Sequence, residues 1–412
     1  MKHVWILNHY AQEPGGAGGT RHYSLARHLP SYGWTASIIA ASTDHMTGRQ
    51  RLSDGEQKRV ETFGGVPFLW LRTSSYAGNG ADRVRNMLDY TRAVLMRDAL
   101  SSLEPPDVII GSSIHPLAAW AGRRLAKRYR VPFVFEVRDL WPQTLIDMGR
   151  LSSRHPAAMA LRHLERSLYR SANRIIVLLP KAHDYIAPLG IAPDKIVWIP
   201  NGVDLDQFPL PAPKAPSETF TLMYFGAHGA ANGLDNLLQA MKIVEDGAEN
   251  APTAPSIALR LIGQGPLKKS LVALAQDLRL KGVTFEAPVR KDEIPLRAAE
   301  ADAFVICVRQ MRNLYRYGIS MNKIFDYMAA GRPTIISADV ANNPIADSHG
   351  GFTVAPENPE ALADAILRMA ALPPSERAEM GAAARRHLEA NYSMERLSAR
   401  LASTLDACLK AS

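Results

Sequence analysis

The sequence has 412 residues, of which 47% are hydrophobic and 21% charged, and its formal net charge is +8. This length, about two to three typical domains, predicts two domains, and the ordinary globular composition supplies enough apolar material for two cores. Only two cysteines occur, which excludes a disulfide scaffold and a cysteine metal site and indicates a reducing compartment.

The start of the chain is not typical of a secretion signal. The first ten residues, MKHVWILNHY, lack a charged head, a long apolar stretch and a small-residue cleavage site, so they predict a short buried strand. No run approaches the roughly 18 apolar residues that a membrane-spanning helix needs. We therefore expect a cytoplasmic protein, either soluble or attached to the inner face of the cytoplasmic membrane.

The basic charge indicates an anionic partner. Such a charge suits phosphate ligands, an anionic membrane surface or nucleic acid. No stretch interleaves aromatic and basic residues as nucleic-acid modules do, so we expect no nucleic acid. The densest basic stretches are residues 83–98 and 123–130, which predict either solvated helix faces or contact with anionic lipid.

Short apolar runs alternate with amphipathic stretches in two successive sets. Repeated strand–helix alternation predicts an α/β protein with two Rossmann-like parallel sheets, each covered by helices. A proline-rich stretch at 199–218 separates the sets, so we expect a first lobe over 1–200 and a second over 201–392. The expected strands are 3–10, 35–42, 106–113, 132–137 and 174–180 in the first lobe and 220–226, 257–263, 283–289, 303–308 and 333–338 in the second.

Two further expectations concern how these elements pack. Ligands of doubly wound sheets bind beyond the carboxyl ends of the strands, so loops from both lobes are expected to meet at one cleft. The final segment, 393–412, predicts a helix whose stripe of leucines must pack on one of the lobes. The pattern leaves open which lobe this is, and packing back on the first lobe is one of the two choices.

The stretch PGGAGGTRHYSLARHL at 14–29 follows the first strand and opens a helix. Its glycines let a ligand approach the backbone closely, and the free N–H groups of a helix start favour an anion. A cation in the first helical turn opposes the helix dipole, which favours an anionic partner for it. A flexible turn is the alternative, since the spacing departs from the dinucleotide fingerprint. The residues expected to bind ligand here are Gly15, Gly16, Gly18, Gly19 and Arg21.

Polar residues also follow two later strands of the first lobe. His115, in SSIHPLAAW, precedes a proline that starts a helix, and it suits either a sugar hydroxyl or a structural role. Glu136, Arg138 and Asp139, in FEVRDLWPQ, stand together at a strand exit. Charges at such a place either point to a ligand or pair with each other.

The stretch YGISMNKIFDYMAAGRPTII at 317–336 is the most informative. Gly318 allows a close approach, and Ser320 can cap a helix whose start offers free N–H groups. Lys323 and Asp326 are three residues apart and share a helix face, so the lysine suits a diphosphate and the aspartate a ribose hydroxyl. A salt-bridged helix that binds no ligand is the alternative.

These residues resemble the retaining glycosyltransferases of the GT-B fold, specifically the large fourth family (glycosyl transferases group 1). The resemblance rests on IPNGVDLDQF, IGQGPL, AEADAFVICV and NKIFDYMAAGRPTII, which occur in family order and spacing in the second half of the chain. The first-half stretches GGAGGTRHYSLARHL, SSIHPLAAW and FEVRDLWPQ are similar to a bacterial surface-polysaccharide subgroup that includes N-acetyl-L-fucosamine transferases.

The resemblance implies two Rossmann-like lobes facing across a cleft and transfer with retention of anomeric configuration. The donor it implies is a UDP-sugar, a substrate rather than a cofactor. The acceptor is a saccharide linked to a lipid diphosphate, in O-antigen, capsule or exopolysaccharide synthesis. It implies neither a cofactor nor a metal site.

The resemblance also assigns roles to single residues. Asp326 takes the place of the family's ribose-binding glutamate and Gly318 that of its second glutamate, so the two-glutamate motif is not intact. His115 matches the histidine that approaches the donor sugar, and Asp139 lies where related enzymes carry a polar residue near the acceptor. The family's arginine and lysine after the first strand of the second lobe are missing, and other cations are expected to replace them. The residues expected at the nucleotide sugar are therefore His228, Gly265, Arg309, Arg316, Asn322, Lys323 and Asp326.

The expected mechanism stabilises the leaving diphosphate with backbone N–H groups, the helix at 321–330 and basic side chains. The residues expected to be catalytic are His115, Asp139 and Lys323. A UDP-sugar 2-epimerase, which would turn over donor without acceptor, is one alternative. A catalytically silent nucleotide-sugar-binding subunit of a polysaccharide assembly complex is another, because of the gaps at Gly318 and Asn232. The missing fingerprint disfavours a dehydrogenase.

Overall fold

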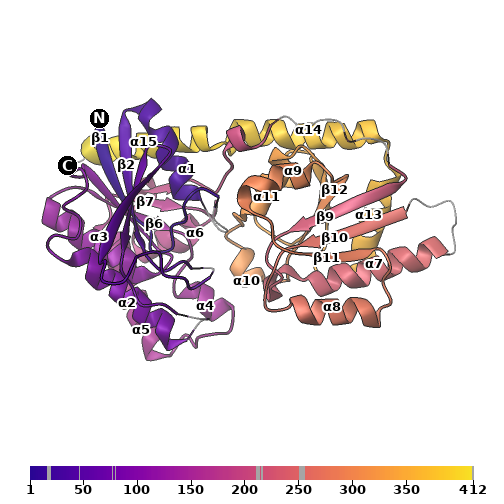
Figure 1. Cartoon of the computed structure of the whole chain (residues 1–412), viewed down its shortest axis with the longest axis horizontal. Helices are drawn as coiled ribbons and strands as arrows, with labels where there is room; N and C mark the ends of the chain where they lie inside the picture. Colours follow the sequence, from indigo (N-terminus) through magenta and orange to yellow (C-terminus); the bar gives the residue numbers. More distant parts are fainter. Residues whose placement is uncertain are drawn as a thin grey trace. The chain divides into compact units, whose positions relative to one another are not determined.

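The structure is a computed structural model, and it describes residues 1–15, 20–45, 47–76, 78, 80–209, 214, 217–249 and 256–410. The chain forms two compact units, unit 1 from Met1–Asn201 with Met394–Ser412 and unit 2 from Gly202–Ser393. Each is a sheet with surrounding helices (Figure 1). The expectation of an α/β protein with two Rossmann-like parallel sheets is confirmed.

Unit 1 is built on an eight-stranded sheet in the order β3-β4-β2-β1-β5-β6-β7-β8. Neighbouring strands are parallel except β3 and β4. The strands are β1 (Lys2–Leu7), β2 (Trp34–Ala41), β3 (Lys58–Phe63), β4 (Val66–Leu71), β5 (Val108–Ser112), β6 (Phe133–Val137), β7 (Arg174–Val177) and β8 (Ile196–Trp198). The α-helices are α1 (Arg21–His28), α2 (Ala81–Leu95), α3 (Pro116–Tyr129), α4 (Gln143–Asp147), α5 (Pro156–Ser171), α6 (His183–Ile186) and α15 (Met394–Lys410).

The antiparallel hairpin of β3 and β4 lies outside the expected strands. Gly64 and Gly65 join its strands with φ values of 50° and 80°, the left-handed conformation that a two-residue hairpin turn requires. β3 is an edge strand of half-buried and exposed residues in which charged and apolar side chains mix, KRVETF. A search for continuous apolar runs therefore passes over it.

The C-terminal helix α15 packs on unit 1. Leu397, Leu401 and Leu405 are at most 2% exposed and belong to a core shared with α1 and with strands β1, β2 and β4. The hydroxyl of Ser398 in α15 donates a 3.0 Å hydrogen bond to the carbonyl of Leu25 in α1. The leucine stripe thus covers the first lobe, one of the two choices that the sequence left open.

Unit 2 is built on a six-stranded parallel sheet in the order β11-β10-β9-β12-β13-β14. Its strands are β9 (Thr219–Phe225), β10 (Ser256–Ile262), β11 (Val283–Glu286), β12 (Ala303–Cys307), β13 (Thr334–Ser337) and β14 (Gly351–Val354). Its α-helices are α7 (Leu234–Glu249), α8 (Lys268–Asp277), α9 (Ile294–Ala298), α10 (Arg312–Tyr315), α11 (Asn322–Ala329), α12 (Pro344–Asp347), α13 (Pro359–Ala371) and α14 (Pro374–Asn391).

The parallel strands bring the loops that follow them to one edge of each sheet. In unit 1 this edge carries the residues after β1, β2, β4, β5 and β6, and in unit 2 it carries those after β9, β10 and β12. Ligands of parallel sheets bind at this edge, so a ligand site is expected at this edge of the sheet in each unit. No helix in the described part of the chain is long and apolar enough to cross a membrane.

Candidate functional site

Two glycine-rich loops cross closely at the ligand edge of unit 2. β9 ends at Phe225 and β10 at Ile262. A Cβ atom at Gly263 would overlap the carbonyl oxygen of Gly226, and one at Gly265 would lie 2.5 Å from the carbonyl oxygen of His228. Glycine is required here because the two loops pack backbone to backbone. Gly265, expected at the nucleotide sugar, therefore has a packing role in the crossing as well.

Lys323, in the first turn of α11, extends to the loop after β9. Its Nζ lies 2.8 Å from the Tyr224 hydroxyl and 2.8 Å from Asn232 Oδ1, and it stands over the Tyr224 ring, 4.4 Å from the centroid. Among the residues with described side chains, no carboxylate pairs with this ammonium group. Desolvation lowers the pKa of Lys323 to about 7, so the group is poised to gain stability from an anion.

His228, in the same loop, is fully buried. Neither ring nitrogen has a hydrogen-bond partner within the described ranges. Burial, followed by the charges of Lys268 and Lys323, lowers the pKa of His228 to about 4. The ring is therefore neutral at pH 7, with one N–H donor and one acceptor unsatisfied, a state that an incoming polar ligand would relieve.

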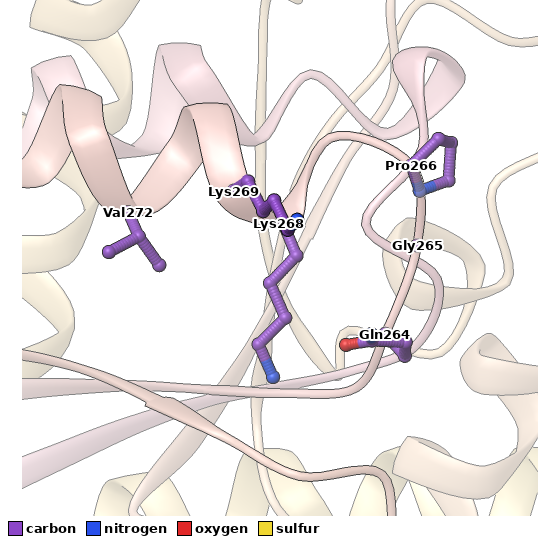
Figure 2. A pocket seen from close by; sticks show the side chains of 6 residues that line it. All are labelled: Gln264, Gly265, Pro266, Lys268, Lys269 and Val272. Carbon is purple, nitrogen blue, oxygen red and sulfur yellow. The ribbon is translucent and has the colours of Figure 1, made fainter.

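A cavity of about 730 Å³ adjoins this loop crossing, along the segment after β10 and the first turns of α8 (Figure 2). Lys268 Nζ donates to the Gly263 carbonyl at 2.8 Å and to the Glu286 carbonyl. The first N–H groups of α8 and the side chain of Lys268 give this wall a positive character. The residues lining the cavity are Gln264, Gly265, Pro266, Lys268, Lys269 and Val272.

Asp326 is 7% exposed and paired inside unit 2. Its two carboxylate oxygens lie 2.8 and 3.0 Å from Lys291 Nζ. A ribose hydroxyl would therefore meet a carboxylate and an ammonium group together, one accepting and one donating. Gly318, at the position of the family's second glutamate, is buried with φ 107°, so the backbone itself favours glycine there.

Arg309 and Arg316, the two arginines expected as replacement cations, do not hydrogen-bond to Tyr224 or Asn232 as Lys323 does. The Arg309 guanidinium forms ion pairs with Asp235 at 2.6 Å and with Glu357 at 2.8 Å, so two carboxylates inside unit 2 already neutralise its charge, and its contact with a nucleotide sugar stays a prediction. Arg316 is exposed and lies over the ring of Tyr317, 4.6 Å from the centroid. Asn322 is half-buried at the start of α11.

At the ligand edge of unit 1, Arg21 and Glu136 form a buried ion pair. Arg21 Nε lies 3.0 Å from Glu136 Oε1, and the guanidinium also donates to the carbonyls of Ile199, at 2.8 Å, and Pro200. Both side chains are 2% exposed. Glu136 is thus an anionic partner for Arg21 within unit 1, and binding of a ligand by Arg21 stays a prediction.

Glu136 receives further donors in the same network. His22 Nε2 lies 2.7 Å from Glu136 Oε2, and the Ser112 hydroxyl donates to that oxygen at 2.7 Å. Burial alone would raise the pKa of Glu136, but His22 and Arg21 hold it well below its usual range. Burial lowers the pKa of His22 and the neighbouring Glu136 raises it, and Asn8 Nδ2 lies 2.7 Å from His22 Nδ1. Glu136 is thus part of an internal network, but its hydrogen-bond partners are Arg21, His22 and Ser112 rather than the neighbouring Arg138 or Asp139 of the same segment.

His115 caps helix α3 and contacts a second histidine. Its Nδ1 accepts from the Ala118 N–H at 3.3 Å, and its Nε2 lies 2.6 Å from His9 Nδ1. Burial, followed by the charge of Arg83, lowers the pKa of His115 to about 3. The neutral tautomer therefore carries its proton on Nε2 and donates it to His9. With 1% exposure and both nitrogens used, His115 does not match the expected direct contact with a donor sugar.

Aromatic rings stack next to His9. Tyr10 lies between the rings of His9, at 4.3 Å, and His45, at 4.2 Å, and His9 also stacks on Tyr90 at 4.6 Å. The Tyr10 hydroxyl accepts from Arg83 Nε at 3.1 Å. These residues follow different strands or lie on α2, so this cluster fixes several loops of the ligand edge together.

The remaining expected residues of unit 1 divide into two groups. Asp139 is exposed after β6, so it is free to meet a ligand. Gly15 is described, with φ 83°, while Gly16, Gly18 and Gly19 lie outside the described residues.

Sequence reasoning missed several residues of these clusters, among them Tyr224, His9 and Lys291. Tyr224 precedes the end of β9 by one residue, His9 is the second residue after β1, and Lys291 lies in the segment after β11. A tyrosine or histidine at a strand exit is a usable signal in the first two cases. Lys291 gives none, because its contact with Asp326 joins residues 35 positions apart. No group of three or more metal-binding side chains is placed to hold an ion among the described residues.

Comparison with known proteins finds two families along the chain. The family described as glycosyl transferase 4-like domain matches residues 16–202, and the family described as glycosyl transferases group 1 matches residues 219–371. The protein named probable glycosyltransferase WbjE of Pseudomonas aeruginosa is 26% identical over 65% of this chain and 66% of its own length. This chain matches about half to two thirds of the length of such curated relatives.

Solved structures share the fold over the whole chain. Sucrose-phosphate synthase from Thermosynechococcus elongatus is 19% identical, covers 100% of both chains and has a TM-score of 0.75. HepE of Anabaena, solved in complex with UDP and glucose, is 16% identical, covers 98% of this chain and 99% of its own, and has a TM-score of 0.64. The matches to the two families follow one another over most of the residues, and the two Rossmann-like units have the GT-B fold of these solved structures.

Proposed function

We propose that the protein transfers a sugar from a UDP-sugar to a saccharide linked to a lipid diphosphate, with retention of anomeric configuration. The observation that carries the proposal is the ammonium group of Lys323, held by Tyr224 and Asn232 with no carboxylate on it among the described side chains. Asn232 lies in the loop where the family's usual arginine and lysine are missing. Lys323 thus supplies from α11 the positive charge that this loop lacks.

The diphosphate would lie between Lys323 and the loop crossing of unit 2. There the first N–H groups of α11, the Lys323 ammonium and a ring nitrogen of His228 provide donors for the charge that develops on the leaving group. Asp326 and Lys291 together suit a ribose diol, since one accepts and the other donates. The HepE structure with UDP and glucose supports UDP as the first nucleotide to test.

In this mechanism the acceptor binds unit 1, and its hydroxyl attacks the donor from the face that UDP leaves. The departing phosphate takes the proton, so no protein nucleophile is needed, and the donors named above replace a metal. Asp139, exposed at the ligand edge, is proposed near the acceptor. His115 is proposed to act through the packing of that edge rather than by touching sugar. The finer proposal is an N-acetyl-L-fucosamine donor in O-antigen, capsule or exopolysaccharide assembly.

A second proposal is peripheral contact with anionic lipid on the cytoplasmic side. α2 exposes Arg85 and Arg92 beside Val84 and Leu88, which are 55% and 39% exposed. α3, which packs against α2, exposes Arg124, Lys127 and Arg128. Cations next to apolar side chains suit the interface of an anionic membrane.

The proposed donor is tested by a thermal-shift panel of UDP, UDP-N-acetylglucosamine, UDP-N-acetyl-L-fucosamine, GDP and ADP. UDP compounds are expected to raise Tm, because a ligand at about one hundred times its Kd adds about 2.7 kcal/mol of stability. A response to purine nucleotides alone would contradict the UDP assignment. Conversion of the donor without any acceptor, followed by NMR, would favour a 2-epimerase, and binding without any turnover a silent subunit.

Replacing Lys323 by alanine is expected to weaken UDP binding by about tenfold to a hundredfold in titration calorimetry. The reason is that a hydrogen bond to a charged group contributes about 1.5–3 kcal/mol. Lys242→Ala, which removes an exposed lysine of α7, is the matched control and should bind UDP normally. Equal affinity in the two variants would remove Lys323 from the diphosphate site.

The affinity for UDP is expected to fall as pH rises through 7. Bound diphosphate raises the pKa of Lys323, so binding requires the protonated lysine, and with a free-state pKa of about 7 affinity drops about fivefold between pH 7 and pH 8. The terminal phosphate is already ionised above about pH 7 and adds no slope there. Titration calorimetry of the Lys323→Ala variant should show a flat profile over the same range, and a flat profile in the unmodified protein would contradict the linkage.

Binding to vesicles that contain anionic lipid is expected to fall as salt rises from 50 to 500 mM, since each surface cation contributes about 1 kcal/mol and salt screens it. A sedimentation assay with neutral vesicles as control measures this. The Arg85→Gln/Arg92→Gln variant should sediment less at low salt. Salt-independent binding would argue against an electrostatic membrane contact.

A further inference from the structure

A cavity of about 450 Å³ lies in unit 1, at the carboxyl end of β4. It lies in a different unit from the site around Lys323. Polar side chains from the loop after β2, from the segment that follows β4 and from α2 line it. The lining residues are Gln50, Asp54, Arg72, Thr73, Ser74, Ser75 and Asp89.

The walls of this cavity are held in place by hydrogen bonds. Gln50 Nε2 donates to the Thr73 carbonyl at 3.0 Å, and the Ser74 N–H donates to Asp89 Oδ2 at 3.2 Å. Asn86 Nδ2 donates to the Ser74 carbonyl at 2.5 Å. The Arg72 guanidinium donates to backbone carbonyls, among them that of Ser53. A ligand would therefore meet a preformed surface and lose little to ordering it.

The chemistry of the lining suits neutral hydroxyl groups. Asp54 and Asp89 offer carboxylate acceptors, and the exposed Ser75 offers a hydroxyl that both donates and accepts. The Ser74 hydroxyl oxygen is buried and has no hydrogen-bond partner in the part of the chain that the structure describes. Two carboxylates against one guanidinium disfavour a phosphate or a uronate. Sugar hydroxyls, which need both donors and acceptors, match this set.

The cavity also adjoins the aromatic residues of the ligand edge. Tyr76 follows Ser75 directly, and its hydroxyl lies 2.6 Å from His45 Nδ1. His45 in turn stacks on Tyr10 at 4.2 Å. The cavity is thus continuous along the chain with the loops where a parallel sheet binds its ligand.

We propose that this cavity binds one neutral sugar residue of the acceptor, through hydrogen bonds from its hydroxyl groups to Asp54 and Asp89. The inference rests on the proposed function and specifies one part of its substrate: the acceptor residue seated here carries no phosphate and no carboxylate. Asp54 and Asp89 then determine which sugars are accepted.

The test measures binding of free sugars to the full-length protein by saturation-transfer NMR. The probes are the methyl α-glycosides of glucose, galactose and N-acetylglucosamine, with glucuronate and glucose 6-phosphate as anionic probes. The Asp54→Asn/Asp89→Asn variant keeps an amide oxygen that can accept from the Ser74 N–H, so the wall retains its shape. Asp82→Asn, an exposed carboxylate on the same helix as Asp89, is the matched control.

At least one neutral glycoside is expected to bind, about tenfold more weakly in the double variant and unchanged in the control. Failure of every neutral glycoside to bind, preference for an anionic probe, or equal affinity in the double variant would overturn the inference. UDP binding to the same samples is measured separately. Sugar binding without UDP binding would contradict the proposed function but support a sugar site in this cavity. UDP binding without sugar binding would contradict the sugar site but leave the proposed donor unaffected.

Discussion

The chemistry proposed for unit 2 depends on a desolvated ammonium group that no carboxylate neutralises among the side chains that the structure describes. Removing a lysine from water costs free energy unless an anion or good hydrogen-bond acceptors replace the water. Tyr224 and Asn232 supply only neutral oxygens to Lys323, so the compensation is partial. The unsatisfied ring of His228 lies in the same loop that supplies Asn232 to Lys323. A diphosphate would complete the compensation in one step.

Unit 1 solves the same electrostatic problem in the opposite way. Arg21 and Glu136 are as deeply buried as any charges in the molecule, but they neutralise each other and are surrounded by further donors and acceptors. No external anion is needed to stabilise them. The guanidinium of Arg21, which Glu136 neutralises, supports the fold, whereas the ammonium group of Lys323 is where we propose that a ligand binds.

Sequence patterns predicted the parts of the molecule that depend on local periodicity. The apolar runs at 3–10 and 220–226 became β1 and β9, and the helix expected after Gly318 became α11 with Lys323 in its first turn. What could not be predicted depends on partners far apart in the chain. The histidine at 115 looks the same in the sequence whether its ring faces a ligand or His9, 106 positions away, and Arg309 gives no sign of Asp235 or Glu357. Strand β3 escaped because it mixes polar and apolar residues on a half-exposed face, whereas β4, VPFLWL, is an apolar run that the sequence does signal and that the expected strands left out.

The anchoring of Arg21 constrains how this chain can vary. One guanidinium joins the first helix, strand β6 and the carbonyls of Ile199 and Pro200 where the chain leaves unit 1. A lysine carries the same charge, but its compact ammonium group cannot span three acceptors in one plane. Replacing either Arg21 or Glu136 alone would leave the other buried charge unpaired and lower the free energy of unfolding by about 3–5 kcal/mol. We therefore expect substitutions at positions 21 and 136 to be tolerated only when both residues are replaced together by a pair that leaves no buried charge.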